Sequence, residues 1–258
     1  MAINKKLIHF KNKENFNTEV ANGNILDNSI VFIQDSKEIS THGTVYKTVN
    51  WSVLEEPELY EWVDLGLPSG LKWAAWNVGA TKPEEYGLYF AWGETQGYEG
   101  ITDEKQFSWE DYKLCGGSDS TLTKYNTNSS YGTVDNKLVL EQVDDAVYTS
   151  DNTCRMPTRA ELEELTANTT STRETLNCVN GRSFTSKTNG NSIFVPAAGY
   201  CYDGSVDSVG SNGSLWSSSL DESESGDAWY LDFGSDYVFV SSCIRYNGST
   251  VRAVKSNN

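Results

Sequence analysis

Residues suited to catalysis are few in this chain. It has only two histidines, His9 and His42, and both lie within the first 55 residues. A Ser-His-Asp or Cys-His site needs a histidine within hydrogen-bonding reach of its nucleophile. The rest of the chain contains no histidine, which excludes such a site there and favours a protein that is not an enzyme.

One acidic cluster has the residue types of a cation site. Asp221, Glu222, Glu224 and Asp227 follow one another closely, and carboxylate oxygens are the ligands that Ca²⁺ prefers. A solvated acidic loop is the better explanation of the same residues. We expect the solvated loop, with no bound metal and no cofactor.

The five cysteines are spread widely along the chain. They are Cys115, Cys154, Cys178, Cys201 and Cys243. No pair has CxxC spacing, and an odd number leaves at least one thiol unpaired. A disulfide framework and a zinc cluster are therefore both unexpected, and folding in a reducing cytoplasm fits best.

The overall charge restricts the class of partner. The formal net charge is -16 and the pI is about 4.5, which opposes binding to nucleic acid or to an anionic membrane. No apolar run is long enough for a transmembrane helix. The first sixteen residues, MAINKKLIHFKNKENF, lack the apolar core of a signal peptide, so we expect no export by the general secretion route.

The segment 228–255 is better suited to recognition than to catalysis. Tyr237, Phe239, Cys243 and Ile244 fall in an expected hairpin and loop, and exposed apolar side chains usually mark a contact surface. Tyr and Phe give a large contact area at low entropic cost, while neighbouring Ser and Asn adapt their hydrogen bonds. A packed strand face remains open for the two aromatics, as does a buried thiol for Cys243.

Two parts of the chain must position these residues. The acidic, Pro-containing run 55–58 suggests a boundary between residues 1–55 and 56–258. In the smaller part, the segments 29–33 and 44–46 predict strands. So small a part can hardly bury a core alone, so we expect it to pack on a partner or on copies of itself.

The larger part contains one clear helix signal. Thr158 and Glu161 form a T-x-x-E capping box before Leu162 and Leu165, which predicts a helix that begins after Thr158 and ends in the polar run 166–174. A hairpin is expected between Val63 and Trp76, turning at Pro68-Ser69-Gly70. We expect a long loop over 114–131 and a short helix over 139–147.

From residue 192 onward the pattern is strand and turn. Buried or alternating runs predict strands at 193–195, 216–219, 229–233, 237–240 and 249–254. In the third of these, Trp229, Leu231 and Phe233 share one face. Short antiparallel strands, few helices and long loops indicate an α+β domain with a small β-containing appendage at its N-terminus.

Several motifs in residues 60–255 resemble one known family. They are VDLGLPSGLKWAAWNVGA, YGLYFAWGE, CRMPTRAELEEL, IFVPAAGY, GSNGSLWSSS and RYNGSTVRAV. In this order they resemble the C-type lectin-like domains of variable proteins that diversity-generating retroelements diversify, common in Bacteroidetes and their phages. The pattern is also similar to phage major tropism determinants and to formylglycine-generating enzymes. The resemblance implies the formylglycine-generating-enzyme-like variant of the C-type lectin fold.

The resemblance also implies a variable region, about residues 199–252. Mutation at template adenines cannot produce Lys, Glu, Gln, Met or Trp, and the segment 234–247 contains none of these. The implied display positions are Cys201, Asp203, Ser214, Leu215, Tyr230, Asp232, Asp236, Tyr237, Phe239, Ser241, Ser242, Cys243, Ile244 and Asn247. The implied scaffold is Trp216, Trp229, Gly248, Val251 and Arg252, with Arg252 as a structural hydrogen-bonding or ion-pairing group.

By resemblance, the chain is expected to be a receptor-binding protein of a phage tail fibre. It would be made in the host cytoplasm, join other virion tail proteins as a trimer, and bind a bacterial surface protein or glycan. The SIVFIQDSKEISTHGTVY segment is similar to the start of such virion proteins. A bacterial cell-surface adhesin of the same fold is the alternative. An enzymatic site using Cys201 and Cys243 as a copper pair is disfavoured, because their surroundings do not match the motif of formylglycine-generating enzymes.

Overall fold

The computed structural model describes residues 7–10, 30–33, 38–41, 44–47 and 59–256. By its internal contacts the chain divides into two compact units, residues 1–58 and 59–258. The division lies at the end of the acidic run 55–58, close to where the sequence predicts a boundary. The larger unit carries every predicted site residue.

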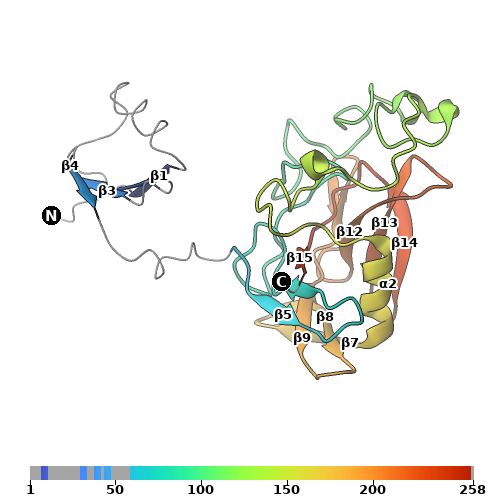
Figure 1. Ribbon diagram of the computed structural model, residues 1–258. Coiled ribbons are helices and arrows are strands. Elements are labelled where there is room, and N and C mark those ends of the chain that lie inside the picture. The colour runs from blue at the N-terminus through green and yellow to red at the C-terminus, as the bar shows by residue number, and fades with distance from the viewer. Residues whose placement is uncertain (1–6, 11–29, 34–37, 42–43, 48–58, 257–258) are drawn as a thin grey trace. The chain divides into compact units, whose positions relative to one another are not determined.

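The smaller unit contains a four-stranded sheet in the order β1-β2-β3-β4. Its strands are β1 (Leu7–Phe10), β2 (Ile30–Ile33), β3 (Glu38–Thr41) and β4 (Thr44–Lys47) (Figure 1). β1 and β2 run parallel, while the other neighbouring pairs run antiparallel. The strands predicted at 29–33 and 44–46 are confirmed as β2 and β4. His42 lies outside the described residues.

The larger unit begins with the hairpin predicted from its sequence. Strands β5 (Trp62–Asp64) and β6 (Lys72–Ala74) pair antiparallel, and the backbone N–H of Gly70 closes the turn on Leu67 at 2.9 Å. β15 (Val254–Lys255) pairs with the other edge of β6. The prediction of a strand over 249–254 is wrong in its extent, because only its last residue belongs to a strand.

The predicted capping box starts the one α-helix among the described residues, α2 (Arg159–Asn168). The backbone N–H of Thr158 donates to the Glu161 carboxylate at 2.7 Å, and the N–H of Glu161 donates back to the Thr158 hydroxyl at 3.4 Å. The Arg155 guanidinium donates two hydrogen bonds to the same carboxylate, at 2.6 and 2.8 Å. The capping box therefore determines where α2 begins and supplies the hydrogen bonds that stabilise its first turn.

An antiparallel meander follows α2 directly. Its strands are β7 (Thr169–Leu176), β8 (Val179–Ser186) and β9 (Ser192–Pro196). The predicted buried strand at 193–195 is confirmed as part of β9. The polar run 166–174, expected only to end the helix, instead forms most of β7, an edge strand whose side chains are largely exposed.

The segment between the hairpin and α2 is mostly irregular. The long loop predicted over 114–131 is confirmed, with two short 3₁₀ turns, η2 (Asp119–Thr121) and η3 (Ser129–Tyr131). The short helix predicted over 139–147 is reduced to one 3₁₀ turn, η4 (Gln142–Asp144). A 3₁₀ turn suits a stretch in which Asp145 caps the backbone of Val147 and Tyr148 with its own side chain.

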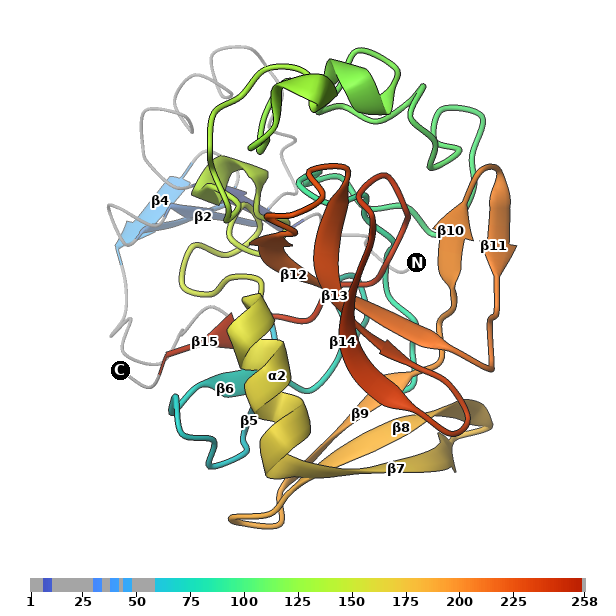
Figure 2. The ribbon, with the colours of Figure 1, turned by 90° about the vertical axis from the view of Figure 1, so that its right-hand side faces the viewer.

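The remaining strands form a hairpin and a second meander. The hairpin is β10 (Tyr200–Tyr202) with β11 (Ser205–Asp207). The meander is β12 (Gly213–Leu220), β13 (Asp227–Phe233) and β14 (Val238–Ile244), in that order across the sheet. Figure 2 shows α2 lying along one face of this sheet, with the β10–β11 hairpin to the other side of β14.

The segment 245–254 runs through the interior rather than along an edge. Val251 and Ala253 are fully buried, and Thr250 bonds to the backbone of Ser214 and Trp216 in β12. Arg252 is also fully buried. Its guanidinium donates to the Asn77 side-chain oxygen at 2.8 Å and to two backbone carbonyls at 3.0 Å, so the predicted structural hydrogen-bonding role is confirmed.

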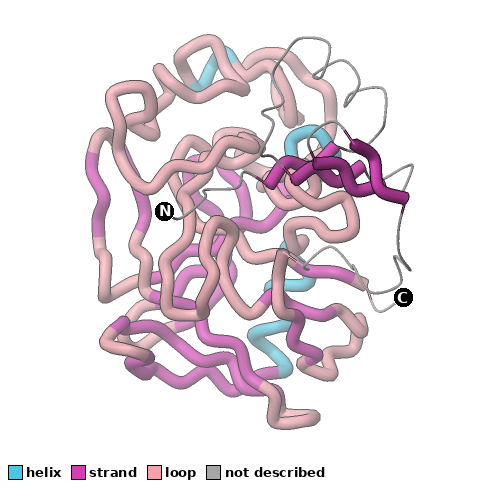
Figure 3. Tube along the Cα trace, turned by 90° about the vertical axis from the view of Figure 1, so that its left-hand side faces the viewer, coloured by secondary structure: helices cyan, strands magenta, loops and turns pink. Residues whose placement is uncertain are grey.

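The structure is therefore an α+β fold of short, mostly antiparallel strands. Figure 3 shows these strands as separate pieces joined by long loops, with few helical turns. Three clusters of buried side chains fill the larger unit, the first around Trp92 and Trp216, the second around Trp73 and Leu165, and the third around Phe107. Within the described part of the chain, no helix has the length and apolarity needed to cross a membrane.

Candidate ligand-binding pocket

The register of the β12–β13–β14 sheet separates its residues into two faces. Tyr230 pairs with Ser241 and Asp232 with Phe239, and directly opposed residues of antiparallel strands share a face. Ser214, opposite Asp232, belongs to the same face. We call the set Ser214, Tyr230, Asp232, Phe239, Ser241 and Cys243 the pocket face.

The opposite face is packed against α2. Leu215, Leu231 and Phe233 are buried in the cluster that contains Leu165 of α2. Closer to the start of the helix, the Arg159 guanidinium lies 3.5 Å from the centre of the Trp229 ring. This face is therefore occupied within the chain itself, and only the pocket face is open to a ligand.

A hollow of about 410 Å³ lies between the pocket face and the β10–β11 hairpin. Its lining residues are Tyr200, Tyr202, Asn212, Ser214, Tyr230, Asp232, Tyr237, Cys243, Asn247 and Ser249. Four of the ten are tyrosines, and none is Lys, Arg or His. A hollow of this size accommodates a small molecule or one or two protruding side chains.

Asp232 is the one carboxylate in the lining. It is half-buried, and loss of hydration raises its pKa above the ordinary range. Hydrogen bonds from the hydroxyls of Tyr230 and Tyr237 oppose this rise without cancelling it. The carboxylate is thus held between two phenols, in a setting that penalises its negative charge.

The other polar groups of the pocket are partly satisfied. The Asn212 amide donates to the Tyr237 hydroxyl at 2.8 Å, and the Ser214 and Ser249 hydroxyls lie 2.7 Å apart. Asn247 bonds to the Cys243 thiol, but its side-chain oxygen Oδ1 is buried without a partner. A buried acceptor without a partner is costly in the folded protein.

Aromatic rings form the outer rim. Tyr237 and Phe239 are 38% and 45% exposed, and their rings stack at 5.0 Å with an interplanar angle of 21°. Across the hollow, Tyr202 stacks on Tyr246 at 5.7 Å. The packed strand face that the sequence left open for Tyr237 and Phe239 is not what is observed, because both side chains remain accessible.

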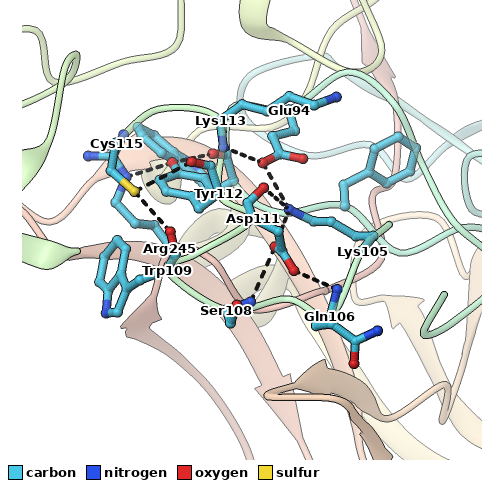
Figure 4. A network of polar contacts seen from close by, with 12 residues as sticks. Glu94, Lys105, Gln106, Ser108, Trp109, Asp111, Tyr112, Lys113, Cys115 and Arg245 are labelled. Atoms are coloured by element: carbon cyan, nitrogen blue, oxygen red, sulfur yellow. Dashed lines mark hydrogen bonds and ion pairs between the residues drawn. The ribbon is translucent and has the colours of Figure 1, made fainter. Parts of the chain in front are cut away.

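A buried ion-pair network holds the loop 94–115, which supports one wall of the pocket (Figure 4). The Lys105 ammonium is 3.0 Å from the carboxylates of both Glu94 and Asp111. The Asp111 carboxylate also accepts from the backbone N–H groups of Gln106 and Ser108 at 2.5 and 3.3 Å. One ammonium is therefore shared between two carboxylates of the same loop.

This loop positions the β10–β11 hairpin. The backbone carbonyls of Gln106 and Phe107 accept from the N–H groups of Gly204 and Asp203 at the hairpin turn. Beneath the hairpin, the Phe107 ring packs so closely on Gly248 that an added Cβ there would lie 2.6 Å from it. Because Tyr200 and Tyr202 are on β10, the network sets their distance from the pocket face.

Six predicted display residues line the hollow. They are Ser214, Tyr230, Asp232, Tyr237, Cys243 and Asn247. Asp203, Asp236 and Phe239 are exposed outside this lining, and Ser241, Ser242 and Ile244 are partly buried. Ser242 belongs to the helix-covered face, as the pairing of Trp229 with Ser242 requires.

The prediction of surface display is wrong for Cys201 and Leu215. Both side chains are fully buried, and burial raises the pKa of the Cys201 thiol to about 12. Leu215 falls on the face covered by α2, and Cys201 packs with Phe107. The predicted scaffold residues Trp216 and Val251 are buried as expected.

Four lining residues were not predicted, namely Tyr200, Tyr202, Asn212 and Ser249. A sequence signal for the first two exists. Asp203 and Gly204 both have positive φ, 44° and 77°, the geometry that Asp-Gly favours in a two-residue hairpin. The alternation Tyr200, Cys201, Tyr202 ahead of that turn would have placed both tyrosines on one face, with the cysteine on the other.

The acidic segment 221–227 is not the uniformly solvated loop that was expected. Asp221 is buried and accepts from the Ser223 backbone and hydroxyl at 3.0 and 2.7 Å. Burial and repulsion from Glu224 and Asp221 raise the pKa of Asp227 to about 6. Among the described residues, no group of three or more His, Cys, Asp or Glu side chains is placed to share a metal ion. All five cysteines are free thiols.

A comparison with models of protein families finds a similarity. Residues 155–254 match the model of a family described as a domain of unknown function, DUF8237. No curated protein and no solved structure matches the chain. The matched segment contains all ten residues that line the hollow, so the pocket lies within the part of the chain that this family shares.

Proposed function

We propose that the larger unit is the ligand-binding domain of a receptor-binding protein. It has a C-type lectin-like fold and displays diversified side chains to a bacterial surface ligand. In this proposal the protein belongs to a phage tail fibre. The smaller unit joins it to other tail proteins and brings three copies together, which strengthens weak binding at single sites.

One observation carries the proposal. All ten residues that line the hollow belong to the segment 199–252, and the same segment also supplies fully buried core residues. Tyr237 lines the hollow and Phe239 lies at its rim, but neither holds the sheet together. Trp216 and Arg252, by contrast, are fully buried and belong to the core. Such a division lets the contact surface change while the fold is kept.

The composition of the hollow favours recognition over turnover. Tyrosine, serine and asparagine dominate its lining, and these residues recur in binding loops that must adapt to different partners. A nucleophile with an adjacent base is not found in it, since burial raises the pKa of the Cys243 thiol well above its usual range.

A double variant tests the proposal. Tyr237→Ala with Phe239→Ala removes the stacked pair at the rim and should lower binding to host cells at least about tenfold, as loss of aromatic anchors does. Binding of labelled full-length chain to a panel of Bacteroidetes strains measures this. The melting temperature should change little, because both rings are exposed.

The matched control is Val134→Ala with Val143→Ala. These side chains are 41% and 69% exposed and lie outside the hollow, so binding should be unchanged. Equal loss in both double variants, or binding of the wild-type chain to no strain, would count against the proposal. A large loss of stability in the first variant would show that the rim residues belong to the core.

The neighbourhood of the gene gives an independent test. A second, near-identical copy of the codons for 199–252, differing mainly at adenines and lying beside a reverse transcriptase gene, is expected. Differences between the two copies should fall on Tyr237 and Asn247 and spare Trp216 and Gly248. A reverse transcriptase without such a copy, or differences spread over the buried residues, would contradict the assignment of the variable positions.

A further inference from the structure

The charge of the pocket is left uncompensated by the chain. Asp232 takes its two side-chain hydrogen bonds from tyrosine hydroxyls, and no cation contributes to its pKa. The guanidinium of Arg182 donates to the backbone carbonyls of Gly234 and Ser235 at 3.0 Å. Among the residues that line the hollow, none carries a positive charge.

The walls around this carboxylate are suited to a cation. Tyr200, Tyr202, Tyr230 and Tyr237 line the hollow together with Asp232, and the electron-rich faces of aromatic rings attract ammonium groups. The formal net charge of -16 adds a long-range attraction in the same sense. A carboxylate surrounded by phenol rings therefore favours a ligand that carries a positive charge.

The acceptors in the lining narrow the kind of cation. The lining combines the Asp232 carboxylate with serine and tyrosine hydroxyls, all of which can accept hydrogen bonds. A primary ammonium carries three N–H donors that can reach separate acceptors, whereas a quaternary ammonium has none. A guanidinium suits a free carboxylate edge, but here Tyr230 and Tyr237 already occupy Asp232.

From this arrangement we propose that the hollow binds a primary ammonium group, specifically the side chain of a lysine on a protein ligand. This inference rests on the proposed function and specifies its ligand. The four methylenes of lysine lie against the tyrosine rings while the ammonium reaches Asp232. The lysine backbone stays at the exposed rim formed by Tyr202, Tyr237 and Phe239.

A long, flexible stem favours lysine over an amino sugar. The carboxylate is half-buried behind rim residues that are 38–45% exposed, so the positive group must extend well beyond its anchor. In an amino sugar the ammonium is attached directly to the ring, and the polar ring would have to enter among the tyrosines.

Small probes test the inference on the full chain. Titration calorimetry would compare Nα-acetyl-lysine methylamide with the same probe acetylated at Nε, which removes the charge and keeps the length. The charged probe should bind at least about tenfold more tightly, the size expected for a desolvated ammonium over aromatic rings. Equal binding of the two probes, or no binding of the charged one, would overturn the inference.

Variants locate the effect. Asp232→Asn keeps the shape of the side chain and should lower the affinity for the charged probe about tenfold or more, with an unchanged melting temperature as evidence of folding. Glu222→Gln, at an exposed carboxylate between β12 and β13 that does not line the hollow, is the matched control and should bind like wild type. An Asp232→Asn variant that is folded and binds equally well would overturn the inference.

A second pair of probes separates the sources of the ammonium. Glucosamine and N-acetylglucosamine differ in the same charge, and tighter binding of glucosamine than of the lysine probe would overturn the lysine assignment in favour of a glycan. The cell-binding experiment stays separate. If wild-type chain binds cells but the lysine probe does not bind, the ligand is wrong and the receptor-binding proposal stands. If the lysine probe binds but the chain binds no strain, the ligand assignment stands and the receptor-binding proposal is wrong.

Discussion

Two carboxylates of the larger unit, Glu94 and Asp232, lie among aromatic rings in opposite electrostatic situations. Glu94 is buried against the Lys105 ammonium at 3.0 Å, with Phe107 and Tyr112 nearby. Asp232 is half-buried and has only phenolic hydroxyls as side-chain donors. The loop around Glu94 contains its own counter-charge, whereas the pocket around Asp232 does not.

The comparison shows where this fold can leave a charged group without a counter-charge from the chain. Ions that position the backbone are paired inside the chain, because an unpaired buried charge is strongly destabilising. A charge at the accessible hollow can remain unpaired, since water reaches it until a ligand arrives. Charges are more numerous around Lys105 than around Asp232. A charge without a counter-charge is therefore a better guide to the ligand site here than the number of charges.

The largest expected effect comes from breaking the paired region. Lys105→Met keeps the length of the side chain but leaves Glu94 and Asp111 facing each other without a cation. The free energy of unfolding should fall by about 3–5 kcal/mol, measured by urea denaturation. Lys113→Met is the control, because the Lys113 side chain is exposed and only its backbone N–H bonds Glu94. A loss below about 1 kcal/mol would mean that the ion pairs do not hold the loop.

A smaller effect is expected where the paired region meets the pocket. Gly248→Ala would place a Cβ 2.6 Å from Phe107 and 2.7 Å from Cys201, so neighbouring groups must move at a cost of about 2 kcal/mol. Gly226→Ala is the control, because its added Cβ would meet nothing closer than 3.8 Å. If the two variants have equal melting temperatures, the contact between loop and hairpin is not tight.

The smallest effect concerns Asp227, a third carboxylate that has no described cation to lower its pKa. Since burial and repulsion raise its pKa to about 6, the charged form costs stability in the folded state. That cost is absent below the ordinary pKa of about 4 and complete above pH 6. Asp227→Asn should therefore stabilise the protein by about 1–2 kcal/mol at pH 7.5 and by nothing at pH 3.5.

Unfolding followed by denaturant at the two pH values measures this difference. Glu224→Gln removes one repelling neighbour and should reproduce part of the gain. A stabilisation that is independent of pH would show that the Asp227 carboxylate is not the titrating group.

Local signals were sufficient for several elements. The Thr158–Glu161 capping box gave the start of α2, and the turn at residues 234–236 gave the β13–β14 hairpin, because each depends on neighbours in sequence. β7 was missed since its Thr-rich, charged sequence lies on an edge with little apolar pattern. The C-terminal strand was overextended, because the apolar residues of 249–254 are buried by segments far away in the chain rather than by strand pairing.

The candidate site was predicted only in part, because alternation along a strand is a local signal. Alternation could have separated Ser241 from Ser242, and it could have shown that Ser214 and Leu215 point to opposite faces. What alternation could not give is which face α2 covers, or that the β10–β11 hairpin lies across from Tyr230. Both depend on tertiary contacts: the packing of Leu165 of α2 on Leu231 and Phe233, and the bonds of the hairpin turn to Gln106 and Phe107 in the loop 94–115.

The path of residues 245–254 through the interior has a consequence for synthesis. Arg252 bonds Asn77, 175 residues earlier in the chain, and Val254 pairs with Trp73. Contacts so distant in sequence form late, so the nascent domain cannot close its core until residue 255 has left the ribosome. A reading frame lost anywhere before residue 245 yields a polypeptide without this central segment. Proteases would remove such truncated products, leaving only chains that contain this segment.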